Sequence, residues 1–140
     1  MLDEPEFRRW MESARKTLMS AERDVSGGDY NWACFKAHQA SEKALKAILW
    51  GIGKPCIGHS LTHLLNYLSE SLEDQVPEDI LDASITLSRY YTPTRYPDAW
   101  SEGIPEEYYS KKDAEEAINL SKKLVEWVEN VWRRLSGKEL

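Results

Sequence analysis

The chain contains 140 residues, of which 30% are charged, and its formal net charge at pH 7 is -6. A chain of this length forms one domain around a single hydrophobic core, so we expect one domain over residues 1–140. The acidic balance argues against general DNA binding, which needs a basic face to offset the phosphates. It still allows one small anion site in a locally basic pocket.

The N-terminus is acidic and has no apolar signal core, and no apolar run approaches the roughly 20 residues of a membrane span. The two cysteines, Cys34 and Cys56, lack the spacing of a metal site. Both are expected to be reduced thiols, with Cys34 buried in a helix. These features together predict a cytoplasmic protein that contacts no membrane.

Apolar residues recur at steps of three and four along the chain, which predicts helices and no convincing strand. The first predicted helix has Pro5 in its first turn and ends at Gly27 and Gly28. The second starts at its N-cap Asp29 and ends near Trp50, and the short link makes the two helices an antiparallel pair. Alanines on several faces of the second helix let other helices approach closely, so it is predicted to be central. They are Ala33, Ala37, Ala40, Ala44 and Ala47.

Three further helices are predicted from start signals and apolar stripes. One opens at His59 or Ser60, and another opens at Pro77. The last opens at a capping box formed by Ser110 and Asp113. The predicted fold is therefore an all-α, antiparallel up-and-down bundle of about five helices.

The segment from Arg89 to Trp100 contains two arginines, four aromatic residues and two prolines in twelve positions. Pro93 and Pro97 fix their own φ angles and restrict the residues before them, which predicts a stiff loop. Arginine supplies a permanently charged donor fork and the rings supply stacking faces, which suits a phosphate or a base. Alternatively, the rings cover the core and Arg95 pairs with Asp98 locally.

The second helix also carries four polar residues at spacings that place them on one face, namely His38, Gln39, Glu42 and Lys46. Such side chains are costly on a central helix unless they bond one another or a ligand. One interpretation is a self-satisfied network in which Glu42 and Lys46 form an ion pair. The other is a ligand site.

Three segments, in their order and spacing, resemble the HEPN domains (higher eukaryotes and prokaryotes nucleotide-binding). They are Phe35–Ala47, Gly58–Leu61 and Ser88–Asp98. The resemblance implies an all-α bundle that is often a homodimer and is often encoded beside a minimal nucleotidyltransferase. It implies a nucleotide-binding module, with ATP or another nucleotide as a possible ligand and no resident cofactor. The expected role is that of a nucleotidyltransferase companion in a toxin–antitoxin-like pair.

Many members of that family are RNA-cleaving toxins, and their motif is an Arg followed after four to six residues by His. The three histidines, His38, His59 and His63, do not stand at that distance after any arginine. We therefore expect no catalytic residues, and an RNA-cleaving toxin with a non-standard active site is the alternative. A helical dimerisation adaptor, with the aromatic loop as its interface, is a further one. His59 and His63 lack a third metal ligand, and His59 is expected to tie its loop to a neighbouring helix.

The predicted binding site is a pocket between the second helix and the loop after the fourth. Its expected residues are His38, Lys46, Arg89, Arg95, Tyr96, Asp98 and Trp100. The histidine and the lysine supply donors, the arginines hold phosphate, and the tyrosine or the tryptophan stacks a base. Asp98 is expected to orient Arg95 without ligand, because a guanidinium fork bonds carboxylates and phosphates alike.

Overall fold

The computed structural model describes residues 1–137, and within them the chain forms five α-helices and no strand. The helices are α1 (Glu4–Gly27), α2 (Tyr30–Gly51), α3 (Leu61–Leu72), α4 (Glu78–Ser88) and α5 (Lys111–Ser136). The predicted all-α class is confirmed. Between α4 and α5, where no regular structure was predicted, lie two short 3₁₀ turns, η1 (Pro97–Ala99) and η2 (Pro105–Glu107). None of the helices in this described part is long and apolar enough to cross a membrane.

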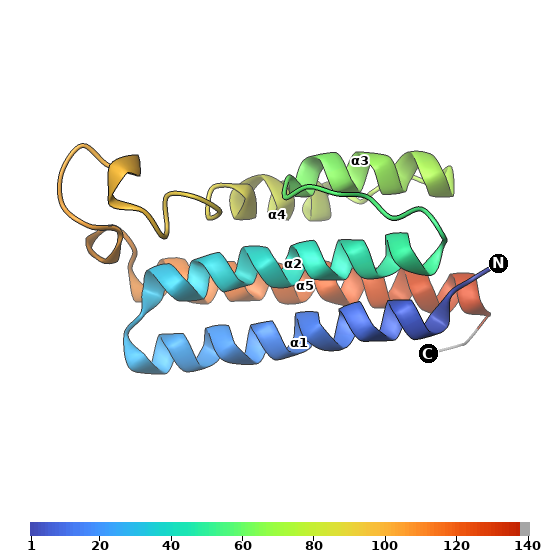
Figure 1. Cartoon of the computed structure of the whole chain (residues 1–140), viewed down its shortest axis with the longest axis horizontal. Coiled ribbons are helices and arrows are strands. Elements are labelled where there is room, and N and C mark those ends of the chain that lie inside the picture. The colour runs from blue at the N-terminus through green and yellow to red at the C-terminus, as the bar shows by residue number, and fades with distance from the viewer. Residues whose placement is uncertain (138–140) are drawn as a thin grey trace.

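The three long helices lie side by side, and α3 and α4 cover one side of them (Figure 1). α1 and α2 are antiparallel, as their short link predicts. The up-and-down alternation of helix directions is interrupted once, because residues 52–60 run back along α2 before α3 begins (Figure 1). As a result α3 runs in the direction of α2, α4 runs back, and α5 is parallel to α2. The start of α3 therefore lies beside the middle of α2.

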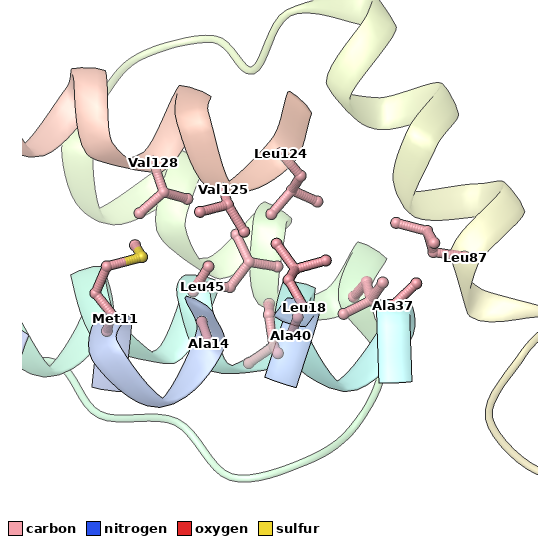
Figure 2. Packing of buried hydrophobic residues seen from close by; sticks show 14 of the residues in the cluster. Met11, Ala14, Leu18, Ala37, Ala40, Leu45, Leu87, Leu124, Val125 and Val128 are labelled. Carbon is pink, nitrogen blue, oxygen red and sulfur yellow. The ribbon is translucent and has the colours of Figure 1, made fainter. Parts of the chain in front are cut away.

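Contacts with each of the other four helices confirm the predicted central position of α2. Its five spaced alanines make this possible, because none of them has exposed surface. Figure 2 shows the resulting core, in which Leu18 of α1, Leu45 of α2 and Leu124 of α5 pack together. Cys34 is buried there as predicted, and burial raises the pKa of its thiol to about 12.

Local hydrogen bonds define most helix starts. Ser60 caps α3 by accepting a bond from the amide of His63 at 3.3 Å. Ser110 and Asp113 form the predicted capping box, with bonds of 2.9 Å and 3.1 Å. Asp29 occupies the N-cap position of α2 but its side chain makes no capping bond. Its backbone, with φ -91° and ψ 65°, lies outside the extended conformation typical of capping residues.

A glycine allows α5 to pack against the end of α2. A Cβ at Gly51 would lie only 2.3 Å from Cζ3 of Trp132. The indole of Trp132 in turn stacks on Phe7 of α1, with ring centroids 4.2 Å apart and planes within 4°. The amide of Asp3 also donates to the carbonyl of Gly51 at 2.7 Å. These contacts join α1, α2 and α5 at one end of the bundle.

Replacing Gly51 by alanine should destabilise the protein although alanine favours helices, because the indole of Trp132 must move. Overpacking of this kind costs about 1–3 kcal/mol. Urea unfolding measures the loss. Gly27→Ala is the matched control, since a Cβ there meets only Oδ2 of Asp29 at an ordinary 3.5 Å. Equal stability of the two variants would contradict this account.

Candidate functional site

The polar residues on one face of α2 form a network with the segment before α3. Glu42 is only 7% exposed, and its carboxylate contacts Nζ of Lys46 at 2.8 Å and Nδ1 of His59 at 3.0 Å. A buried carboxylate is tolerated only when such donors replace its lost hydration. The predicted Glu42–Lys46 ion pair is therefore present. His59 ties its segment to α2, also as predicted.

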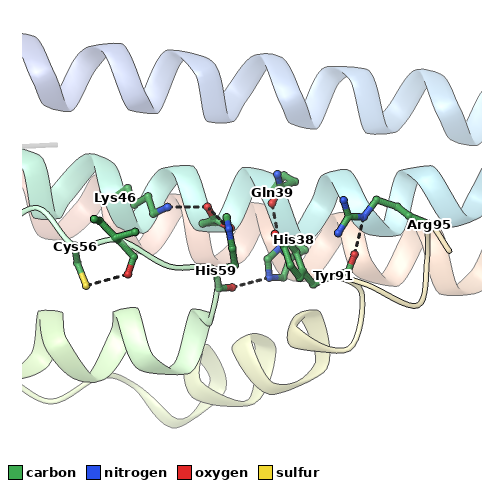
Figure 3. Close-up of polar contacts among 9 residues, drawn as sticks. His38, Gln39, Lys46, Cys56, His59, Tyr91 and Arg95 are labelled. Carbon is green, nitrogen blue, oxygen red and sulfur yellow. Dashed lines mark hydrogen bonds and ion pairs between the residues drawn. The ribbon is translucent and has the colours of Figure 1, made fainter. Parts of the chain in front are cut away.

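His38 lies one turn before Glu42 and is 1% exposed. Its Nε2 donates to the carbonyl of His59 at 3.1 Å, and its Nδ1 lies 3.4 Å from the side-chain oxygen of Gln39 (Figure 3). Burial lowers the pKa of His38 from its usual 6.5, and the nearby charge of Glu42 opposes this shift. His38 thus holds the segment before α3 against α2 through its Nε2, and its burial disfavours the protonated ring.

Tyr91 connects this network to the loop after α4. Its ring stacks on that of His59, with centroids 4.7 Å apart and planes at 20°, and its centroid lies 5.1 Å from that of His38. Cζ of Arg95 lies 4.7 Å from the centroid of the same ring. Figure 3 shows the close approach of these side chains. One tyrosine therefore contacts both histidines and the arginine.

Aromatic rings hold the guanidinium of Arg95. Its Cζ lies 4.2 Å from the ring centroid of Phe35, 4.7 Å from that of Tyr91 and 5.0 Å from that of Tyr96. Its Nε donates to the carbonyl of Tyr91 at 2.8 Å. The expected ion pair with Asp98 is wrong: within residues 1–137 these side chains make no such contact, because the guanidinium lies over Phe35 of α2 instead. The two terminal nitrogens of Arg95 have no hydrogen-bond partner in this part of the chain.

The other predicted loop residues differ in how much of their side chain is exposed and how much is covered by contacts within the loop. Arg89 is exposed at the end of α4, and Tyr96 is 48% exposed. Trp100 stacks on Tyr108 with centroids 3.8 Å apart, and its indole N–H donates to the carbonyl of Pro93 at 2.8 Å. One face of Trp100 is therefore already covered, and its main contacts lie within the loop.

A buried hydrogen bond fastens this loop to the start of α2, and a second one holds the loop itself. Nδ2 of Asn31 donates to the carbonyl of Thr94 at 2.9 Å, and the hydroxyl of Thr94 donates to the carbonyl of Tyr90 at 2.9 Å. Asn31 is 1% exposed and Thr94 is fully buried. The loop is thus joined to α2 by a hydrogen bond between residues 63 positions apart in the sequence.

A groove of about 380 Å³ opens beside Tyr91. Its lining residues are His38, His59, Ser60, Thr62, Ile85, Ser88 and Tyr91. Of the residues predicted for the site, only His38 lines this groove. The remaining lining residues were not predicted as site residues, although most of them lie in Gly58–Leu61 and Ser88–Asp98, the segments that carry the family resemblance. No group of three or more potential metal ligands occurs among residues 1–137.

Comparison with known proteins identifies the family. The model of the HEPN domain family matches residues 7–131. The crystal structure of TT1696 from Thermus thermophilus is similar with a TM-score of 0.85 and 43% identity, covering 89% of this chain and 97% of that chain. No curated protein matches the chain.

Two further crystal structures are similar to this chain. ST0689, an archaeal HEPN homologue, has a TM-score of 0.75 and 39% identity, covering 89% of this chain and 96% of that chain. An HEPN domain protein from Thermotoga maritima, tm0613, has a TM-score of 0.71 and 32% identity, covering 90% of this chain and 98% of that chain. The chain therefore belongs to the HEPN domain family.

The lowered pKa of His38 makes stability depend on pH. As the pH falls through 6.5, the unfolded chain takes up a proton at this position that folded His38 resists, so the free energy of unfolding decreases. Between about pH 7 and about pH 5, we expect His38→Gln to lose less stability than the wild type in urea unfolding. His63→Gln, at an exposed position of α3, should keep the wild-type pH dependence. An unchanged pH dependence in His38→Gln would contradict the role of burial.

Proposed function

We propose that this HEPN domain binds a nucleotide, with a phosphate on the guanidinium of Arg95. The observation that carries the proposal is the state of this side chain: three rings and one carbonyl hold it, while its terminal nitrogens have no hydrogen-bond partner within residues 1–137. The chain has 24 acidic residues, yet none of those described pairs with this arginine. A guanidinium that is already held in place is well suited to bidentate contact with an external phosphate.

Neighbouring loop residues support the same proposal. Arg89 adds a second positive charge at the end of α4, and the half-exposed ring of Tyr96 offers a face for a base. Lys46 and Trp100 take indirect roles, because Lys46 neutralises Glu42 and Trp100 stiffens the loop. The proposed ligand is ATP or another nucleotide.

The proposed partner is a minimal nucleotidyltransferase, with the two proteins forming a toxin–antitoxin-like pair in the cytoplasm. Membership of the HEPN family supports this, since the family resemblance implies frequent encoding beside such an enzyme. Co-purification of this chain with a nucleotidyltransferase encoded next to it would test the partnership. Failure of the two proteins to associate at micromolar concentrations would count against it.

Arg95→Ala should weaken nucleotide binding about ten- to a hundredfold, because a hydrogen bond to a charged group contributes about 1.5–3 kcal/mol. Isothermal titration calorimetry with ATP, GTP and a dinucleotide measures the loss, and circular dichroism checks that the variant stays helical. Arg23→Ala, an exposed position on α1, removes the same charge away from the site and serves as the control. The absence of binding to wild-type protein would refute the proposal and favour the loop as a protein interface.

RNA cleavage is the second candidate, because His38 and Arg95 both contact the ring of Tyr91. A histidine and an arginine near one another can act on a phosphodiester even when the family spacing is missing. On our proposal, RNA incubated with wild-type protein stays intact. Cleavage that is lost in Arg95→Ala, or in Arg89→Ala, would instead favour the nuclease.

We expect the protein to be a homodimer, as the family resemblance implies. Exposed aromatic side chains support an interface, since tryptophan and tyrosine are enriched in such surfaces; Trp32 is 38% and Trp50 is 36% exposed. Light scattering at tens of micromolar should give twice the chain mass of 16.2 kDa. A monomer mass at that concentration would contradict the expectation.

A further inference from the structure

The groove beside Tyr91 differs chemically from the surroundings of Arg95. Within the described chain its polar lining consists of hydroxyl and imidazole groups. The hydroxyl of Ser88 donates to the carbonyl of Ser84 at 2.6 Å, which leaves its oxygen as an acceptor. No positively charged side chain of the described residues lines the groove to offset the charge of a phosphate, whereas hydroxyl and imidazole groups suit an uncharged partner that carries hydroxyls.

Glu42 determines which nitrogen of His59 carries the proton. Nδ1 of His59 lies 3.0 Å and 3.2 Å from the two carboxylate oxygens of Glu42, so it is the donor of that contact. In the neutral ring Nε2 is then an acceptor, and it makes no hydrogen bond within residues 1–137. The side chain is 54% exposed and lines the groove, and its stacking on Tyr91 sets the ring plane.

We propose that this groove binds the ribose of the nucleotide, and that Nε2 of His59 accepts a hydrogen bond from a ribose hydroxyl. The inference rests on the proposed function. Its geometric basis is the ring of Tyr91, whose centroid lies 4.7 Å from the ring of His59 and 4.7 Å from Cζ of Arg95. Phosphate and ribose are adjacent groups of a nucleotide, so the proposal places the phosphate at Arg95 and the ribose in the groove beside Tyr91.

The proposal makes binding depend on one ribose hydroxyl, and the site selects ribonucleotides over deoxyribonucleotides if that hydroxyl is the 2′ one. Loss of one neutral hydrogen bond weakens binding roughly three- to tenfold, so the deoxyribose analogue that lacks the bonded hydroxyl should bind more weakly by that factor. His59 is a binding residue here, and Glu42 is a positioning residue that acts through it by fixing its tautomer.

Calorimetric titration of the full chain with ATP, 2′-deoxy-ATP and 3′-deoxy-ATP tests the inference. In wild-type protein at least one deoxy analogue should bind roughly three- to tenfold more weakly than ATP. His59→Phe keeps a ring against Tyr91 but removes the acceptor, and it should bind all three ligands with similar affinity. His63→Phe is the matched control, since His63 is exposed on α3, close to His59 in the sequence, and should keep the wild-type selectivity.

Nitrogen-15 NMR of the imidazole side chains gives an independent readout. Without ligand, neutral His59 should carry its proton on Nδ1, and its Nε2 resonance should shift on addition of ATP but not of inorganic phosphate. A proton on Nε2 in the neutral ring, or no shift with ATP, would overturn the assignment.

The outcomes separate this inference from the function on which it rests. If no nucleotide binds, both fail. If ATP and both deoxy analogues bind wild-type protein equally, nucleotide binding stands and ribose recognition fails. If His59→Phe stays folded by circular dichroism but keeps the wild-type selectivity, His59 is only structural and the inference also fails.

Discussion

The arrangement of the site depends on the need to pair the buried carboxylate of Glu42. An unpaired charge at 7% exposure would cost several kcal/mol. Lys46 supplies one partner from the same helix, and His59 supplies the other from the segment that returns along α2. Once His59 is in place, its carbonyl meets His38 and its ring meets Tyr91. A single electrostatic requirement thus positions three aromatic or imidazole rings.

The loop after α4 shows how a long irregular segment becomes ordered without regular structure. A hydrogen bond joins it to α2, from Asn31 to the carbonyl of Thr94, and Trp100 bonds back to Pro93 within the loop. Proline residues also reduce the entropy that the unfolded loop has to lose. These contacts order the loop on folding, so a small ligand would have little further loop entropy to remove on binding.

Arg95 shows why local pairing rules fail at such a site. Asp98 is the nearest carboxylate along this part of the sequence, but the guanidinium extends toward α2 and lies 4.2 Å from the ring centroid of Phe35. Contact with a ring face stabilises a cation without neutralising it. The positive charge of Arg95 therefore stays available to an anion, whereas a local ion pair would have neutralised it.

The sequence by itself determined the helices, the capping box at Ser110 and the central position of α2. These features follow from apolar spacing, local hydrogen bonds and small side chains, all of which involve residues close together in the chain. It also carried the resemblance to the HEPN family. Only the tertiary structure decided that Tyr91 lies against His59 and Arg95, and that His59 bonds Glu42 across 17 positions. Those contacts depend on where residues 52–60 and the loop after α4 pack against α2. The spacing of apolar residues along the chain carries no information about that packing.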